Sequence, residues 1–205
     1  MLEVESPSGI ARVYLHSSDS ARALLLLGHG AGGGVEALDL VAACEAALAE
    51  RVTVGLVEQP YRVAGRRSPA PARQLDAAWG AVVERLRTRE LGGLPLLVGG
   101  RSLGARVACR TAAATEAIGV LCLAFPLQPP RRQGVAPAPS RISELNAVAV
   151  PTLVVQGTRD PFGMPPAGGQ RVVVGVPGDH SLKADLPAVS AAVQSWLSEL
   201  LARFR

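Results

Sequence analysis

Residues 100–104, Gly-Arg-Ser-Leu-Gly, form a pattern that can turn a serine hydroxyl into a nucleophile. They directly follow an apolar run at residues 94–99, so we expect a strand that turns sharply into a helix over residues 103–114, with Ser102 at the bend. A serine held there with positive φ needs neighbours without Cβ atoms, because strand and helix must approach closely. The free N–H groups at the start of the helix would favour an alkoxide or an oxyanion. The five-residue string also arises by chance in glycine-rich chains, so the prediction depends on its position between a predicted strand and a predicted helix.

Asp160 and His180 stand where a serine nucleophile would need a base and a group that orients this base. Each follows a predicted strand, at residues 152–156 and 171–176, and the carboxyl ends of parallel strands meet at one edge of a sheet. The chain order serine, aspartate, histidine is also the order used by hydrolases with this kind of turn. We therefore predict that His180 takes the proton of Ser102 and that Asp160 orients the imidazole.

Other histidines and carboxylates compete for these roles. His16 lies beside a serine-rich turn near the N-terminus, and His29 precedes the serine in the chain, which leaves His180 as the base or as a plain exposed loop histidine. Asp179 competes with Asp160, but the carboxylate of an adjacent residue usually cannot reach the next ring in the required geometry. We expect Asp179 to structure its loop instead.

A glycine-rich segment, residues 28–34 (GHGAGGG), follows the strand expected at residues 22–27. Hydrolysis through a tetrahedral intermediate needs two N–H donors aimed at the developing oxyanion. We assign these donors to the backbone N–H groups of Leu103 and Ala31, and we expect His29 to be a structural anchor. The alternative is a phosphate-binding loop, but the segment lacks the Lys-Ser/Thr pair that ends such a loop.

Short strand-like runs alternate with longer helical patterns along the chain. This alternation predicts an α/β fold with a mostly parallel central sheet and helices on both faces. We expect a single domain spanning residues 1–205, with no lid domain. The predicted strands are residues 3–5, 11–15, 22–27, 52–57, 94–99, 119–124, 152–156 and 171–176, and the predicted helices are residues 35–51, 71–89, 103–114 and 186–204.

Two segments rich in proline and arginine, residues 58–70 and 126–141, are predicted loops at the same edge of the sheet. Large side chains in the loops of this edge either form an apolar substrate pocket or cap the core beneath the loops. The candidates are Tyr61, Phe125, Phe162 and Met164, with Leu127 beside them. Arginines in the two segments either form a basic rim for an anionic substrate or are simply solvated, and they are Arg62, Arg66, Arg67, Arg131 and Arg132.

The composition narrows the classes of protein to consider. The 205 residues are 48% hydrophobic with a mean hydropathy of +0.25, and neither a membrane span nor a signal peptide is visible, so we expect a cytoplasmic protein without membrane contact. The net charge of +4 comes from scattered arginines, which argues against nucleic-acid binding. Cys44, Cys109 and Cys122 are too widely spaced for a disulfide framework or a metal cluster, so we expect reduced core residues. We expect no metal and no organic cofactor, and nothing specifies an oligomeric state.

Four strings occur in the order found in small α/β-hydrolases related to dienelactone hydrolases: LLLGHGAGGG, GGRSLGARVA, PTLVVQGTRDPFG and GDHSL. From about Arg22 onward the chain resembles this family, above all the branch that includes testis-expressed protein and the NSL histone-acetyltransferase complex subunit. The resemblance implies a serine hydrolase fold with Ser102, Asp160 and His180 as the triad and residues 29–34 on the oxyanion side. Dienelactone hydrolases proper have cysteine at the serine position, and the branch often has glycine at the position of Ala105.

Together these observations predict a serine hydrolase that cleaves a small carboxylic ester, or a thioester, through an acyl-serine intermediate. One alternative is a binding or scaffold protein that keeps the fold, since NSL-type members also act as assembly subunits. Another is an acyltransferase that uses the same triad, because the acceptor depends on water exclusion at the mouth of the site.

Overall fold

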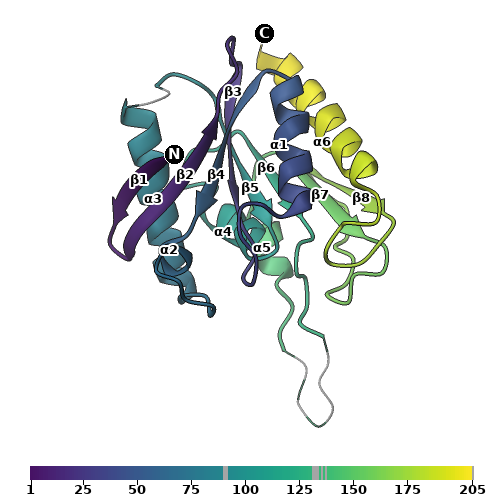
Figure 1. Ribbon diagram of the computed structural model, residues 1–205. Coiled ribbons are helices and arrows are strands. Elements are labelled where there is room, and N and C mark those ends of the chain that lie inside the picture. Colours follow the sequence, from purple (N-terminus) through teal and green to yellow (C-terminus); the bar gives the residue numbers. More distant parts are fainter. Residues whose placement is uncertain (90–91, 131–133, 135, 137, 205) are drawn as a thin grey trace.

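The strands form one eight-stranded sheet in the computed structural model, which describes residues 1–89, 92–130, 134, 136 and 138–204 (Figure 1). The strands are β1 (Leu2–Ser6), β2 (Gly9–His16), β3 (Ala23–Gly28), β4 (Val52–Glu58), β5 (Leu96–Arg101), β6 (Gly119–Leu123), β7 (Thr152–Gly157) and β8 (Arg171–Val176). Their order across the sheet is β1-β2-β4-β3-β5-β6-β7-β8. β2 pairs antiparallel with β1 and β4, and all other neighbours are parallel. The carboxyl ends of the parallel strands therefore meet at one edge.

Helices cover both faces of the sheet (Figure 1). They are α1 (Leu38–Ala49), α2 (Pro60–Val63), α3 (Ala72–Arg89), α4 (Leu103–Thr111), α5 (Ile142–Asn146) and α6 (Leu186–Leu201), followed by a 3₁₀ turn at Ala202–Phe204. α1 and α6 pack together on one face, and α3 and α4 lie on the other. In the described part of the chain, no helix combines the length and the apolar character that crossing a bilayer requires.

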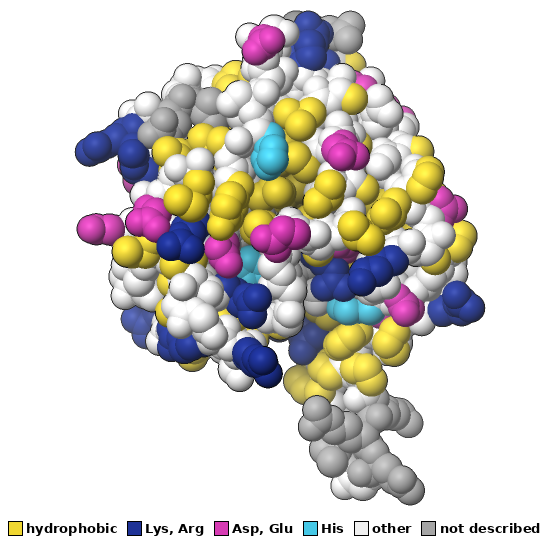
Figure 2. Space-filling model, in the orientation of Figure 1, with side chains coloured by type: hydrophobic (Ala, Val, Ile, Leu, Met, Phe, Trp, Pro, Cys, Tyr) yellow, Lys and Arg dark blue, Asp and Glu magenta, His cyan; other side chains and the backbone are white. Residues whose placement is uncertain are grey.

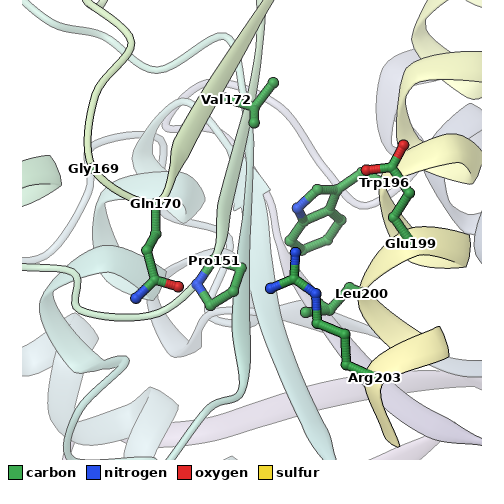
Figure 3. A pocket seen from close by; sticks show the side chains of 8 residues that line it. All are labelled: Pro151, Gly169, Gln170, Val172, Trp196, Glu199, Leu200 and Arg203. Atoms are coloured by element: carbon green, nitrogen blue, oxygen red, sulfur yellow. The ribbon is translucent and has the colours of Figure 1, made fainter. Parts of the chain in front are cut away.

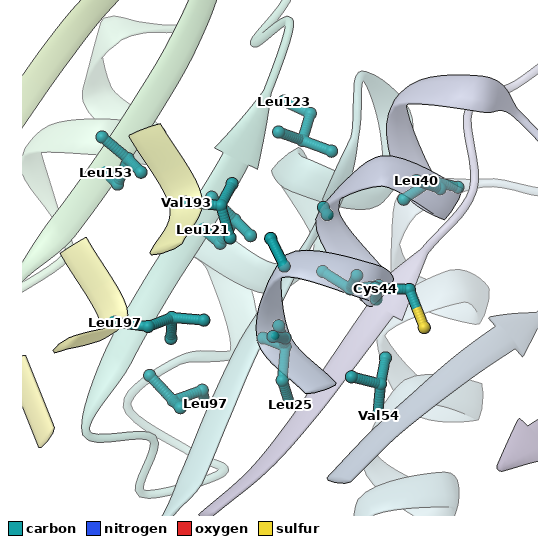
Figure 4. Close-up of a cluster of buried hydrophobic side chains, with 14 of the residues drawn as sticks. Leu25, Leu40, Cys44, Val54, Leu97, Leu121, Leu123, Leu153, Val193 and Leu197 are labelled. Carbon is teal, nitrogen blue, oxygen red and sulfur yellow. The ribbon is translucent and has the colours of Figure 1, made fainter. Parts of the chain in front are cut away.

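The central strand β3 is buried on both faces, which explains its unbroken run of leucines. Leu25 and Leu27 belong to the core cluster beneath α1 and α6, whereas Leu24 and Leu26 belong to the cluster beneath α3 and α4. Figure 4 shows side chains of the first cluster, with those of the sheet facing the helices. A parallel strand buried on both faces needs apolar residues at every position, because successive side chains point to opposite faces.

The α/β fold with a mostly parallel sheet is as predicted, and the differences lie at the ends of elements. α1 begins at Leu38 instead of residue 35, and α4 ends at Thr111 instead of residue 114. Two short helices, α2 and α5, were not predicted, because four or five residues are too few to show a helical period. The three cysteines are buried and free, as predicted: Cys44, Cys109 and Cys122.

Candidate active site

Ser102 occupies a strained turn between β5 and α4. Its backbone has φ 51° and ψ −103°, a combination that side-chain-bearing residues rarely adopt. The glycines around it are required by close contact, because a Cβ on Gly100 or Gly104 would collide with the backbone of Gly28 at the end of β3. The N–H of Ser102 donates to the carbonyl of Leu123, 2.9 Å away, which ties the turn to the neighbouring strand β6. The strain is thus held in place by the sheet on both sides.

The side chains of Ser102, His180 and Asp160 form one continuous chain of hydrogen bonds. His180 Nε2 lies 2.9 Å from Ser102 Oγ, and His180 Nδ1 lies 2.8 Å from Asp160 Oδ2. Because a carboxylate only accepts, Nδ1 carries the ring proton and Nε2 is left to accept the serine proton. Asp179 lies elsewhere: it is exposed, and its Oδ1 accepts from the N–H and the hydroxyl of Ser181, hydrogen bonds that lower the pKa of this carboxyl.

The Asp160 carboxylate is fully buried and has three hydrogen-bond partners. Besides His180, its Oδ2 accepts from Gln156 Nε2 at 2.8 Å, and its Oδ1 accepts from the N–H of Phe162 at 2.8 Å. Gln156 lies in β7 and is itself fully buried, with its amide also donating to the carbonyls of Phe125 and Gly163. The carboxylate therefore has a fixed orientation toward the imidazole. Sequence reasoning missed Gln156, although a polar residue at the end of an apolar strand was the available signal.

Arg101, the residue before Ser102, holds the backbone of His180. Its Nη2 donates to the His180 carbonyl oxygen at 3.0 Å, while its Nε lies 2.9 Å from Asp39 Oδ2 in the first turn of α1. Burial raises the pKa of the Asp39 carboxyl, and the nearby guanidinium of Arg101 opposes that shift. Arg101 thus connects α1 to the loop that carries the imidazole. Sequence reasoning also missed this contact, because a motif position that accepts any residue gives no hint of a distant carboxylate partner.

The two backbone N–H groups predicted to bind an oxyanion lie on the loop after β3 and at the first residue of α4, and these segments meet beside Ser102. A Cβ placed on Gly30 would lie only 3.7 Å from the Cβ of Ser102, so the loop after β3 passes next to the nucleophile. Within the described residues, neither the N–H of Ala31 nor that of Leu103 donates to another group. The Tyr61 hydroxyl donates to the Ala31 carbonyl oxygen at 3.1 Å, which fixes the orientation of the loop. Both N–H groups are therefore available to a ligand.

His29 is buried, with 2% of its surface exposed, and both ring nitrogens bind backbone groups. Nδ1 lies 2.7 Å from the carbonyl oxygen of Gly30, and Nε2 accepts from the N–H of Gln59 at 3.1 Å. Burial lowers the pKa of the imidazole, which keeps the ring neutral. His29 thus links the loop after β3 to the end of β4.

Two of the four candidate substrate contacts are core residues, which corrects the expectation for them. Tyr61 and Phe125 are 1% and 0% exposed, and both belong to the core cluster beneath α3 and α4. Tyr61 lies in α2 and its hydroxyl donates to the carbonyl oxygen of Ala31, while Phe125 lies two residues after the end of the buried strand β6. Phe162 is partly exposed and stacks on His180, with ring centroids 4.4 Å apart, while Met164 is 44% exposed. Phe162 therefore contacts the proposed base.

Three of the five arginines expected at the rim lie in the described part of the chain. Arg66 and Arg67 are exposed after α2, Arg62 is half-buried, and Arg131 and Arg132 lie outside the described residues. Figure 2 shows Lys and Arg side chains scattered over several parts of one face, with acidic side chains between them. This distribution favours solvated arginines over an anion-steering rim.

The family described as Alpha/beta hydrolase domain matches residues 21–186 of this chain. A comparison with curated protein sequences found no match.

Solved structures share the fold at low sequence identity. Est1E from Butyrivibrio proteoclasticus, solved with ferulic acid bound, has a TM-score of 0.80 and 16% identity, over 98% of this chain and 100% of that one. A serine hydrolase without a lid from Xanthomonas campestris has a TM-score of 0.77 and 20% identity, over 97% and 93%. A dienelactone hydrolase from Anabaena variabilis has a TM-score of 0.76 and 16% identity, over 97% and 95%.

Proposed function

This chain belongs to the alpha/beta hydrolase family, and from that premise we propose that it is a serine hydrolase that cleaves a small carboxylic ester through an acyl-Ser102 intermediate. The observation that carries the proposal is the unbroken chain of hydrogen bonds from Ser102 through His180 to Asp160, at 2.9 and 2.8 Å. A hydroxyl next to an oriented neutral imidazole is an activated nucleophile.

In the first half of the reaction, the Oγ atom of Ser102 attacks the ester carbonyl carbon while His180 Nε2 takes the hydroxyl proton. The carbonyl oxygen becomes an oxyanion, which accepts hydrogen bonds from the N–H groups of Ala31 and Leu103. The buried Asp160 carboxylate stabilises the imidazolium that forms. When the tetrahedral intermediate collapses, the bond to the alcohol oxygen breaks and His180 returns its proton to that oxygen.

In the second half, water replaces the alcohol. His180 Nε2 takes a proton from the water, whose oxygen attacks the acyl carbon, and the same N–H groups hold the second oxyanion. Collapse of this intermediate releases the carboxylic acid and returns the proton to Ser102 Oγ. None of these steps requires a metal or an organic cofactor.

The structural neighbours support an ester as the bond that is cleaved. One neighbour is a serine hydrolase without a lid, another binds ferulic acid, and a third is a dienelactone hydrolase. The motif order also supports placing this chain in the dienelactone-hydrolase-related branch, with serine in place of the cysteine that those enzymes use. No connection between the described elements at the catalytic edge is long enough to form a separate lid domain, which favours a small ester.

The proposal is tested by labelling with a fluorophosphonate, which reacts only with an activated serine. We expect wild type to be labelled at Ser102 and Ser102→Ala to lose both the label and ester hydrolysis, with kcat lowered by at least about 10⁴-fold. Ser195→Ala, which changes an exposed serine on α6, is the matched control and should keep both. A wild-type protein that takes up no label would favour a binding or scaffold role.

A further inference from the structure

A pocket of about 490 Å³ opens beside the proposed catalytic residues. Three of its lining residues adjoin them in the chain: Gly32 follows Ala31, Arg101 precedes Ser102, and Ser181 follows His180. The remaining lining residues are Gly33, Gly34, Glu36, Ala37, Leu38, Asp39 and Lys183. The pocket therefore lies beside the segments that carry Ala31, Ser102 and His180. We refer to it as the Gly32 pocket.

Two other cavities of the described residues lie away from the catalytic edge. The cavity in Figure 3, about 290 Å³, is lined by Trp196, Leu200 and Arg203 near the end of α6, together with Pro151 just before β7. It thus lies at the amino ends of the parallel strands, opposite Ser102. A larger cavity of about 780 Å³ lies between α4 and α5 and contains no residue adjacent in sequence to the proposed triad. Of these three cavities, the Gly32 pocket is the one whose lining residues adjoin the proposed catalytic residues in the chain.

No close contact in the folded chain requires Gly32 or Gly33 to lack a side chain. A Cβ on either residue would meet no heavy atom within 4 Å, and neither has a φ in the left-handed region. This contrasts with Gly100 and Gly104, where a Cβ would collide with neighbouring backbone. Neither packing nor conformation explains the missing side chains, but both glycines line the pocket, and their effect is to keep it open.

The wall of the pocket combines apolar surface with two acidic and two basic side chains. Ala37 and Leu38 are the apolar side chains among its described lining residues. Asp39 and Arg101 neutralise each other at 2.9 Å, which leaves the carboxylate of Glu36 and the ammonium of Lys183, neither with an ion-pair partner among the described residues. An alkyl chain would desolvate these groups without replacing their hydrogen bonds. Hydroxyl groups, in contrast, donate to a carboxylate and accept from an ammonium.

We propose that the Gly32 pocket binds the leaving alcohol of the substrate and that this alcohol is uncharged and polyhydroxylated, as in an acetylated glycerol or sugar. The assignment rests on the proposed function. The alcohol oxygen takes its proton from His180, so the alcohol lies on the side of the segment that follows His180, which supplies Ser181 and Lys183 to the pocket. Gly32 and Gly33 are then specificity-determining residues, which leave room for the alcohol.

The test compares two acetate esters of equal carbon count that differ by two hydroxyl groups. We expect kcat/KM for glyceryl monoacetate to exceed that for n-propyl acetate by at least about tenfold, the factor that one well-made hydrogen bond contributes. Acetate release is followed by titration at constant pH. Equal values for the two esters would overturn the assignment, and so would a preference for the anionic ester acetoxyacetate over glyceryl monoacetate.

Variants locate the preference in the pocket. Gly32→Ala and Gly33→Ala add one methyl group into the cavity, and each should lower the ratio of kcat/KM for glyceryl monoacetate to that for methyl acetate by about fivefold or more. Gly80→Ala is the matched control, because a Cβ there also meets nothing within 4 Å but lies on α3, away from the pocket. Lys183→Met, which removes the ammonium, should lower the preference for glyceryl monoacetate over n-propyl acetate. Unchanged ratios in all three pocket variants would contradict the proposal.

Fluorophosphonate labelling separates the two possible failures. A protein that is labelled at Ser102 and hydrolyses acetate esters without the preference disproves only the pocket assignment. The assignment also fails if Ser102 is labelled but glyceryl monoacetate is not hydrolysed. A protein that is not labelled and hydrolyses no ester disproves the proposed function as well.

Discussion

Two histidines stand at the same edge of the sheet, and their partners give them opposite properties. His180 binds the Asp160 carboxylate through Nδ1 and the Ser102 hydroxyl through Nε2, and 19% of its side chain is exposed. His29 binds a carbonyl oxygen through Nδ1 and a backbone N–H through Nε2, and it is 2% exposed. Both rings carry their proton on Nδ1, yet only one of them can pass a proton on.

The difference teaches that the group at each ring nitrogen decides the role of the ring. A hydroxyl gives up its proton to Nε2, and a carboxylate stabilises the imidazolium that results. A backbone N–H gives up no proton at neutral pH, and a charged His29 would lose the hydrogen bond that Nε2 accepts from Gln59. His180 is thus arranged for proton transfer, whereas His29 is arranged to remain neutral.

The largest effect is expected where the partner of His180 Nδ1 is changed. In Asp160→Asn, an amide replaces the carboxylate, so the ring loses the group that fixes its tautomer and stabilises its charge. We expect kcat to fall by about 10³- to 10⁴-fold, measured with a chromogenic acetate ester. Asp179→Asn, which changes the adjacent exposed carboxylate, is the matched control and should stay within about twofold. If kcat falls by a similar factor in both variants, Asp160 is not the residue that orients His180.

A smaller effect is expected where the backbone of His180 is released. Arg101→Met keeps an unbranched apolar stem but removes the guanidinium, which is the donor to the His180 carbonyl and the partner of Asp39. Because Arg101 acts through His180, we expect kcat to fall by about 10- to 100-fold with a much smaller change in KM.

Arg110→Met is the control for Arg101→Met, since Arg110 is an ion-paired arginine on α4 that contacts Asp76 and Glu144 instead of the site. It should lower thermal stability and leave kcat within about twofold. If Arg101→Met lowers stability by a similar amount and kcat is unaffected, Arg101 has no positioning role.

The smallest effect is expected on stability, at His29. Burial lowers the pKa of His29 below its ordinary value of 6.5, so the unfolded chain takes up a proton first as the pH falls. The contribution of His29 to stability is therefore present above about pH 6.5 and is lost as the pH falls through the lower pKa of the folded state. His29→Gln should lower the free energy of unfolding by about 1–2 kcal/mol at pH 8 and should flatten its decline on acidification.

Urea unfolding between pH 8 and pH 5 measures this decline. His16→Gln, at an exposed position on β2, is the matched control and should retain the wild-type difference between the two pH values. An unaltered decline in His29→Gln would mean that the ring does not have to be neutral in the folded state.

Local patterns in the sequence were enough to predict most of the sheet and to select the candidate residues. The run of leucines in β3 indicated a buried strand, and the turn at Ser102 was visible from its glycines. The choice of Asp160 and His180 followed from their positions after two predicted strands, and the structure brings both side chains into one hydrogen-bonded chain with Ser102.

These local patterns did not predict contacts between segments that are far apart in the chain. Tyr61 and Phe125 appeared to be surface contacts because they lie in or beside loops, but both pack into the core. Gln156 and Arg101 support the site through partners that no local rule identifies, since their roles depend on which carboxylate or carbonyl the fold brings near. The short helices α2 and α5 were missed because so few residues show no period.

The sequence by itself determined the class of fold, the strained serine turn, and the set of residues that can act at the carboxyl ends of the strands. These features depend on local spacing and on alternation along the chain, which any sequence displays directly. Only the tertiary structure decided which side chains are buried, which histidine is held neutral, and where a pocket remains open beside Ser102. The physical reason is that burial, ion pairing and cavity shape arise from contacts between residues far apart in the chain, and a linear pattern does not encode those distances.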